Sequence, residues 1–419
     1  MMKLLTYRTL TLFLLFTFVN DVTAQTPSIF LLQGDSTFAK HGSFIELHGS
    51  GYYRSNALNN EYVNRMVIGG YIGPDTKANI SDNLSGMNRL GSEASFGMSY
   101  WNMGDSLFNK PHLGIKLLVD VKYDASMSFT DDLYKVVFEG NEQFRGQEIN
   151  FEGTAAEYYA YQKLGFGIFD KRTLSGISLS YVNGQDYLQS YVNNGSLFTS
   201  QRGDSLHVTY DGTYSQSLSN NGFGTGKGVG AAVDLNVNFP LIDDKGFISL
   251  YVNDIGFVHW NAVTTYRADS SLSYTGVEFS NLFGDELSQL EMPSLIDSLA
   301  YDSTVAADIK VLPLSLGVSM LHEIGESGFI EVGLRIKPTR SHTPEIYAKY
   351  HYFMNSTTQF SASARYGGYG NLRFGFDLQK MCGNWYVSVG SDDVPGLILN
   401  SSRGRGAYAQ IGRFFGKYD

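Results

Sequence analysis

The sequence predicts an all-β fold, a single transmembrane antiparallel β-barrel of about fourteen strands (roughly twelve to sixteen) with short loop helices. Three observations lead to this prediction. Stretches of about ten residues alternate between apolar and polar along the whole chain, as transmembrane β-strands do. Charged residues recur on the polar side, where they would be costly in a dry core but cheap in a water-filled lumen. An export signal precedes all of these stretches.

The first 24 residues have the layout of a secretory signal peptide. Lys3 and Arg8 form a positive start, an apolar run covers residues 10–19, and Val22-Thr23-Ala24 places small residues before the cleavage point. The apolar run is too short to span a bilayer. The expected domains are a signal peptide (1–24), an N-terminal leader or small plug (25–42) and an outer-membrane β-barrel (43–419).

Composition narrows the alternatives. The 46 Gly, 28 Tyr and 28 Phe suit the turns and aromatic girdles of a barrel, although a large secreted β-sandwich would also accept them. Mean hydropathy is −0.15, and no run of 18 apolar residues follows the signal, which excludes a helical membrane protein. A net charge of −10 without a basic stripe argues against nucleic acid as a partner. The single cysteine, Cys382, cannot form an internal disulfide, so an exported chain needs another source of stability, such as barrel closure.

The clearest predicted element is a hairpin over residues 311–337. In its first arm, apolar residues alternate with small or polar ones from Leu312 to Met320. Gly325-Glu326-Ser327-Gly328 supplies the turn, because glycine accepts positive φ. In its second arm, Ile330 to Ile336 alternate with charged or small residues.

The same alternation predicts the other strands, and most connections are predicted to be short in the last third of the chain and long in the middle. Short turns would lie in the periplasm and long loops outside. The predicted strands cover residues 43–53, 94–100, 113–122, 157–169, 174–181 (followed by Asn183-Gly184), 229–239, 248–253, 345–352, 360–366, 372–379, 385–389 and 407–415. Short helices are predicted over residues 74–84, 131–138 and 285–299, the second with an N-cap at Thr130 and an end at Gly140.

The charged residues on the polar sides of these strands are the candidate lumen-lining site. They could simply pair across strands and fill a narrow barrel. Alternatively, they could set the selectivity of a path through it. The candidates are Lys116, Asp120, Lys122, Asp234, Glu331, Arg335, Glu345, Lys349, Arg365, Arg373 and Asp377.

No catalytic, cofactor or metal site is predicted. Gly104-Asp105-Ser106-Leu107 and Gly203-Asp204-Ser205-Leu206 match an esterase tetrapeptide, but turn preferences alone produce such sequences. The glycines of residues 222–230 lead into a strand, whereas phosphate-cradling loops lead into a helix. The eight histidines are scattered without the spacing of metal ligands.

Three stretches resemble an uncharacterised family of outer-membrane barrels from Bacteroidetes: Phe129-Thr130-Asp131-Asp132-Leu133-Tyr134, Val182-Asn183-Gly184-Gln185-Asp186-Tyr187-Leu188, and residues 63–90, read as an apolar strand followed by Met87-Asn88-Arg89. More remotely, the layout is similar to barrels of the long-chain fatty acid transporter type and to the PorV and PorP-like barrels of type IX secretion. A shared fold does not specify a function.

The expected function is a non-enzymatic barrel in the outer membrane of a Gram-negative bacterium. In the first reading it is a channel or transporter for a small or hydrophobic solute. In the alternative it is a non-transporting structural or accessory subunit of a type IX secretion-like envelope assembly. The expected partners are outer-membrane lipid and, in the alternative, an envelope protein.

Overall fold

The computed structural model describes residues 42–104, 107–218, 226–242, 245–274 and 301–416. The expected signal peptide, the leader up to residue 41 and the helix predicted over residues 285–299 lie outside the described residues.

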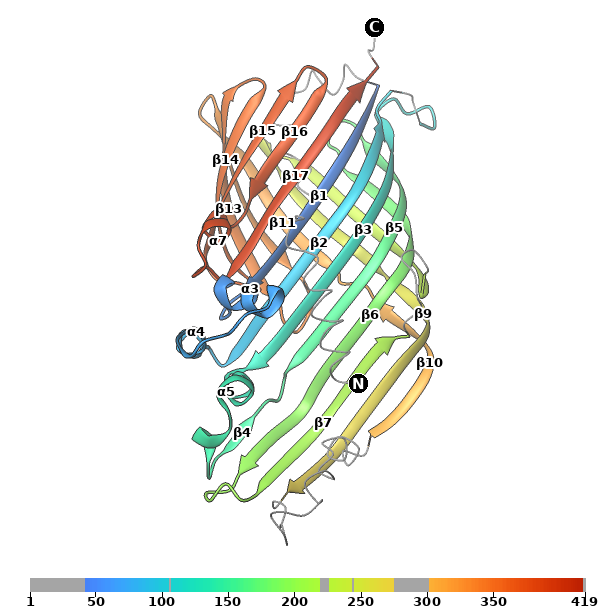
Figure 1. Cartoon of the computed structure of the whole chain (residues 1–419). Helices are drawn as coiled ribbons and strands as arrows, with labels where there is room; N and C mark the ends of the chain where they lie inside the picture. The colour runs from blue at the N-terminus through green and yellow to red at the C-terminus, as the bar shows by residue number, and fades with distance from the viewer. Residues whose placement is uncertain (1–41, 105–106, 219–225, 243–244, 275–300, 417–419) are drawn as a thin grey trace.

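Among the described residues, seventeen strands form one antiparallel sheet that closes into a fourteen-strand barrel (Figure 1). The first and last strands close the ring, with Ser43 opposite Phe415 and Arg54 opposite Gly404. Closure satisfies the backbone hydrogen bonds of a chain in lipid, where an open sheet edge is not tolerated. The predicted all-β barrel of about fourteen strands is therefore confirmed. The strands are β1 (Ser43–Ser55), β2 (Met87–Asn102), β3 (Leu113–Thr130), β4 (Glu148–Asn150), β5 (Ala155–Asp170), β6 (Gly176–Thr199), β7 (Leu206–Ser217), β8 (Gly228–Pro240), β9 (Gly246–Tyr274), β10 (Tyr301–Val311), β11 (Ser315–Ile324), β12 (Gly328–Ile336), β13 (Thr343–Asn355), β14 (Thr358–Gly368), β15 (Arg373–Cys382), β16 (Trp385–Ser391) and β17 (Gly404–Phe415).

Seventeen strands make a fourteen-position ring because three positions each hold two strands lying end to end. β4 and β5 pair successively with β6. β7 and β8 lie one after the other between β6 and β9. β10 and β11 pair successively with β9. The ring order is therefore β1, β2, β3, β4/β5, β6, β7/β8, β9, β10/β11, β12, β13, β14, β15, β16 and β17.

One side of the barrel extends far beyond the other. β6 has 24 residues and β9 has 29, whereas about 9–11 residues cross a bilayer. Together with β4, β7 and β10, the ends of β6 and β9 form a one-sided sheet that we call the tall wall; it occupies the lower part of Figure 1. The start of β1 and the last residues of β17 lie together on the side of the barrel away from the tall wall, and we call this side the terminal end. We call the side that carries the tall wall the distal end.

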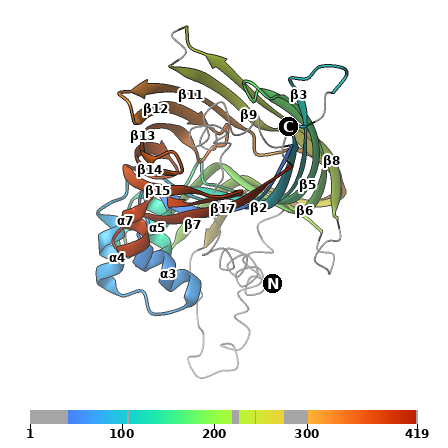
Figure 2. The ribbon, with the colours of Figure 1, turned by 90° about the horizontal axis from the view of Figure 1, so that it is seen from above.

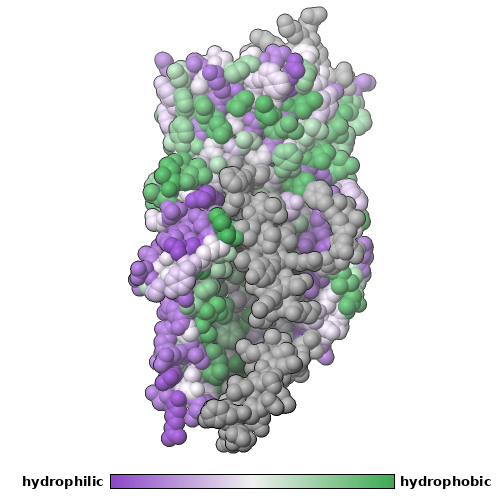
Figure 3. All heavy atoms as spheres, viewed as in Figure 1, coloured by the Kyte–Doolittle hydropathy of each residue, from purple (hydrophilic) through white to green (hydrophobic). Residues whose placement is uncertain are grey.

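The outward side chains of the strands form an apolar surface near the terminal end. Phe96, Leu117, Leu164 and Leu179 are exposed there, Leu179 by 62%. In Figure 3, apolar residues are frequent on the upper part of the visible face, mixed with hydrophilic ones, and a mostly hydrophilic stretch lies at the lower left. An outward apolar band around a barrel is what lipid contact requires.

The helices of the described residues gather on one side of the barrel at its distal end (Figure 2). They are α3 (Asn60–Ile68), α4 (Pro74–Ser81), α5 (Asp131–Glu139), α7 (Val394–Ile398) and the 3₁₀ turn η1 (Glu142–Phe144). The helices predicted from residues 74 and 131 are confirmed, including the Thr130 cap, whose hydroxyl accepts from the Leu133 amide at 3.2 Å. None of the described helices has the length and apolar character needed to span a membrane.

Three details of the sequence prediction were wrong. The apolar stretch expected as a strand within residues 63–90 is helix α3, because the Asn59 side chain caps it at the Tyr62 amide and its apolar face packs on α5. Asn183-Gly184 lie inside β6, which does not end at Tyr181. The first arm of the predicted hairpin starts at Ser315, since Val311 ends β10 and a short break separates the two strands.

Two of the stretches that carry the family resemblance are joined by hydrogen bonds at the distal end. Asp131 accepts hydrogen bonds from the Gly86 amide at 2.9 Å and from Asn88 Nδ2 at 2.6 Å. Behind this contact, the rings of Tyr62 and Phe138 pack edge to face at 5.4 Å. These motif residues therefore hold the helices against the barrel.

Replacing Asp131 with Ala is expected to loosen the segment that follows it while the barrel stays folded. The lost bonds lie partly in water, so the cost is about 1 kcal/mol. Limited proteolysis should cut residues 131–154 faster than in the parent protein. Val137→Ala, an exposed change on the same helix, should leave the cleavage rate unchanged. Equal cleavage of Asp131→Ala and the parent would contradict this role.

Candidate functional site

The structure places all eleven candidate residues on barrel strands with their side chains on the inward side. Ten of them pair with other inward ionisable side chains, and Lys116 lies over the Trp101 ring at 4.3 Å. The pairs are His48–Asp120, Lys122–Asp254, Lys163–Asp234, Arg335–Glu93, His351–Glu331, Lys349–Asp377, Arg365–Glu345 and Arg373–Glu345.

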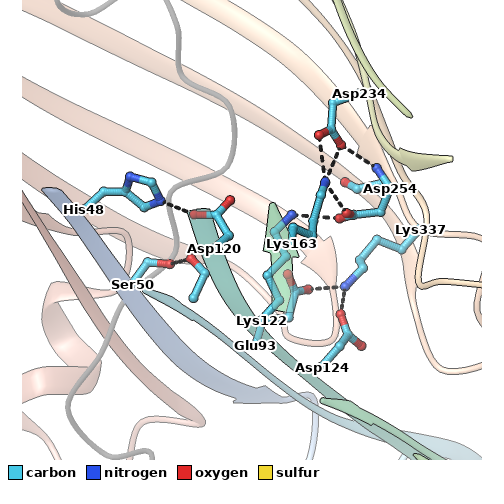
Figure 4. Close-up of polar contacts among 12 residues, drawn as sticks. His48, Ser50, Glu93, Asp120, Lys122, Asp124, Lys163, Asp234, Asp254 and Lys337 are labelled. Atoms are coloured by element: carbon cyan, nitrogen blue, oxygen red, sulfur yellow. Dashed lines mark hydrogen bonds and ion pairs between the residues drawn. The ribbon is translucent and has the colours of Figure 1, made fainter. Parts of the chain in front are cut away.

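One set of pairs joins opposite walls, and we call its residues, Glu93, Asp124, Arg335 and Lys337, the cross-lumen belt. Arg335 Nη2 donates to Glu93 Oε2 at 2.8 Å, and Lys337 Nζ lies 2.8 Å from Glu93 Oε1. Lys337 also contacts Asp124 (Figure 4). β2 and β12 are seven positions apart in a ring of fourteen, directly opposite each other. Side chains therefore meet across the lumen at this level.

A second cluster joins β3, β5, β8 and β9, and we call it the lysine cluster. Lys163 Nζ lies 2.7 Å from both Asp234 Oδ2 and Asp254 Oδ1, and Lys122 Nζ lies 2.8 Å from Asp254 Oδ2 (Figure 4). Asp254 occupies a bulge with φ of +62°, and its amide donates to Asp234 Oδ1 at 2.9 Å. The bulge turns the Asp254 carboxylate inward to a position that strict alternation denies it.

Three arginines converge on a single carboxylate toward the distal end. Arg373 Nη2 lies 2.6 Å from Glu345 Oε2, Arg365 Nη1 lies 3.2 Å from Glu345 Oε1, and Arg54 lies 3.8 Å from the same group. Glu345 is only 1% exposed. Arg54 also contacts Asp392 beyond β16. The cluster therefore connects β1, β13, β14, β15 and a distal loop.

His48 carries a further inward pair nearer the terminal end. Its Nε2 lies 2.7 Å from Asp120 Oδ1, and its Nδ1 lies 3.7 Å from Glu46. Gly97 makes room for this pair, because a Cβ there would lie 1.8 Å from Asp120 Oδ1 and 2.5 Å from a backbone oxygen. A larger residue at this position would separate His48 from Asp120.

Tyr369 and His342 cover the belt from the distal side. The buried Tyr369 ring lies 4.9 Å from the His342 ring, edge to face. Burial, together with Arg335 and Lys337 nearby, lowers the pKa of His342 to about 3. The imidazole is therefore neutral at ordinary pH and adds no charge to the belt.

Two apolar clusters also occupy the lumen. Tyr187 and Trp260 pack with Tyr159 and Tyr161 beside the lysine cluster, with 5.6 Å between the Tyr187 and Trp260 ring centroids. The second cluster, at the terminal end, surrounds Phe44 and Phe414. The inward surface thus consists of paired charges flanked by aromatic groups. Among the described residues, no group of three or more His, Cys, Asp or Glu side chains could hold a metal ion.

A sequence model described as a family of unknown function (DUF5723) matches residues 51–392. The chain belongs to this family. The resemblance to an uncharacterised family is therefore confirmed, while the bacterial group and the likeness to PorV and PorP stay predictions. No curated protein matches the chain.

Several solved structures have a similar arrangement of the chain. They include a TodX monoaromatic hydrocarbon channel mutant (10% identity, TM-score 0.42, 92% of this chain and 93% of that chain), the P. putida toluene transporter TodX (10%, 0.40, 94% and 93%) and the CymD monoaromatic hydrocarbon channel (9%, 0.31, 96% and 95%). Similarity this low identifies no solute for the present chain.

Sequence reasoning missed several inward partners for two reasons. Glu93 and Asp124 lie one or two residues beyond predicted strands, so longer alternating runs would have found them. Lys163 and Lys337 lie inside predicted strands with inward parity but were left out of the candidates. Asp254 could not be found this way, because the bulge in β9 shifts the parity.

Proposed function

We propose that this protein is an outer-membrane channel for a small solute, closed in this structure by the cross-lumen belt. The observation that carries the proposal is the contact between Arg335 and Glu93, whose strands stand on opposite sides of the ring. A contact of this kind blocks the lumen when formed, and its separation would widen the path.

The chemistry of the lining favours a path that can fill with water. Buried ion pairs are often no more stabilising than apolar side chains of similar volume, so filling a permanently sealed barrel does not require them. Charged groups can separate and hydrate when water enters, whereas an apolar lining resists wetting. The belt, the lysine cluster and the three arginines around Glu345 all consist of such charged groups.

The apolar outer surface supports a location in a lipid bilayer, and the connection lengths support an orientation. Bacterial barrels place short turns in the periplasm and long loops outside. Here short turns such as residues 325–327 and 383–384 lie at the terminal end, while the distal end carries the helices. The terminal end would face the periplasm and the tall wall would face the exterior.

The second candidate is a sealed accessory barrel that docks onto an envelope assembly. β10 favours it, because within the described residues this strand pairs with β9 alone. Unpaired strand edges accept strands from other proteins. A type IX secretion-like assembly, named from the resemblance alone, would be such a partner.

Conductance across planar lipid bilayers tests the channel. The charge-balanced variant Glu93→Gln/Arg335→Gln removes the ion pairs that Glu93 makes across the lumen and leaves Lys337–Asp124 as the remaining belt pair between the walls. Openings should become roughly ten- to a hundredfold more frequent than in the parent, since a hydrogen bond between charged groups contributes about 1.5–3 kcal/mol. The measurement is the fraction of time that single reconstituted proteins conduct.

Lys349→Gln/Asp377→Asn is the matched control. It removes a similarly buried pair, 2.9 Å apart, that joins strands only two ring positions from each other. Because this pair lies along one wall, its loss should leave the opening frequency near that of the parent. A belt variant that stays as closed as the parent, even after Asp124→Asn/Lys337→Met is added to remove the remaining pair, would overturn the channel and favour the sealed barrel.

A further inference from the structure

Aromatic and other apolar side chains gather inside the barrel at its terminal end, and we call this group the terminal seal. Its buried members are Phe44, Met103, Phe169, Leu174, Tyr386 and Phe414, and Trp101, Phe353 and Met381 pack against them. β1, β2, β5, β13, β15, β16 and β17 contribute, so the group draws on seven of the fourteen ring positions. It lies between the terminal opening and the charged part of the lumen.

The rings are held close together and against the wall. Phe44 and Phe414 stack with 4.4 Å between centroids, and Trp101 meets Phe169 edge to face at 4.9 Å. Gly412 lets the Phe44 ring lie flat, because a Cβ there would approach that ring to 2.4 Å. Lys116, opposite Trp101 on the neighbouring strand, places its ammonium over the Trp101 ring.

We propose that the terminal seal is a second barrier in series with the cross-lumen belt, and that it restricts passage to small uncharged solutes. This inference rests on the proposed channel. An apolar constriction excludes water, and a charged solute entering it loses hydration without gaining a partner. An uncharged apolar or aromatic group can replace the contact between Phe44 and Phe414 with equivalent ring contacts.

The two barriers exclude solutes by different physical means. The belt closes the lumen by charge pairing, so it yields when water and ions screen or hydrate its members. The seal closes it by excluding water, so a charged solute that passes the belt is still stopped. A solute must satisfy both barriers, which leaves small molecules without net charge.

Thiol labelling tests the charge selection directly. Ser95→Cys places a thiol on the inward side of β2, between the seal and Glu93 of the belt. Cys382, an exposed free cysteine at the terminal end, is an internal reference in the same molecule. The probes are N-ethylmaleimide, which is uncharged, and a trimethylammonium thiosulfonate, which is charged. Relative to Cys382, the position 95 thiol should react at least tenfold faster with the uncharged probe.

Phe414→Ser should collapse this preference to less than about threefold, because a hydroxyl lets water and ions enter. Phe414→Leu should retain most of it, because the site stays apolar although the ring stack is lost. Phe415→Ser is the matched control: the neighbouring ring points outward, is 38% exposed, and should leave the preference unchanged. Unchanged mobility of the folded barrel on a gel shows that each variant is intact.

The outcomes separate this inference from the channel itself. A preference that Phe414→Ser leaves intact would overturn the seal. If Phe414→Ser keeps the preference for the uncharged probe while the Glu93→Gln/Arg335→Gln variant conducts, the proposed seal is contradicted and the proposed channel is not. If position 95 stays unlabelled by both probes even in the belt variant, the lumen is no path, and the channel fails with the seal.

Discussion

Replacing Lys163 with Met is expected to destabilise the barrel by about 3–5 kcal/mol, because breaking a buried ion pair leaves an uncompensated charge. Lys163 is 2% exposed and lies between Asp234 and Asp254. After the change, Lys122 still pairs with Asp254, so Asp234 is the carboxylate left without a cation. The midpoint of urea unfolding in lipid vesicles, followed by the gel mobility of the folded barrel, measures the loss.

The double variant Lys163→Met/Asp234→Asn should recover most of this stability, because it removes the stranded charge and keeps the volume. Lys110→Met, an exposed change in a terminal turn, should stay within about 0.5 kcal/mol of the parent. A single variant as stable as the parent would mean that water already hydrates Asp234, and that the cluster contributes little to the fold.

A Cβ at Gly91 is expected to displace Tyr369, the residue that covers the belt. It would lie 2.2 Å from Tyr369 Cγ and Cδ2, well inside contact distance. Gly91→Ala should therefore cost about 1–3 kcal/mol, as overpacking does. Tyr369→Ala should cost about 3–5 kcal/mol, because it empties a buried site. The same unfolding measurement applies to both variants.

The double variant Gly91→Ala/Tyr369→Ala supplies the decisive comparison. Without the ring there is nothing for the new methyl group to strike, so the double variant should be no less stable than Tyr369→Ala alone. Costs that simply add would show that the two positions do not touch. Ser92→Ala, the next residue on the other face of β2, should behave as the parent does.

The alternation of apolar and polar residues shows which side chains of a strand face inward, but it does not show which strands share a position in the ring. The prediction found hairpins such as the one around Gly325 and the eleven inward charges, because side chains alternate with period two whatever lies opposite. It did not find that β7 and β8 share one ring position, or that β10 and β11 do. Those arrangements depend on pairing with β9, far away in the sequence.

The sequence also did not predict which inward charged residues pair with each other. Arg335 and Glu93 are 242 residues apart, and nothing in either strand indicates the other. Their meeting depends on which strands stand opposite in the ring. Phe44, Phe169 and Phe414 lie near the ends of predicted strands, but nothing in those strands indicated that their rings would meet. Their convergence required the first and last strands of the barrel to pair side by side.

The amino-acid sequence by itself determined a chain of amphipathic strands with charged inner faces, because period-two patterning and composition are local properties. Only the tertiary structure decided the fourteen-position ring, the tall wall and the contact of the belt across the lumen. These depend on strand register and ring closure, which are set by hydrogen bonds between segments that no local pattern connects.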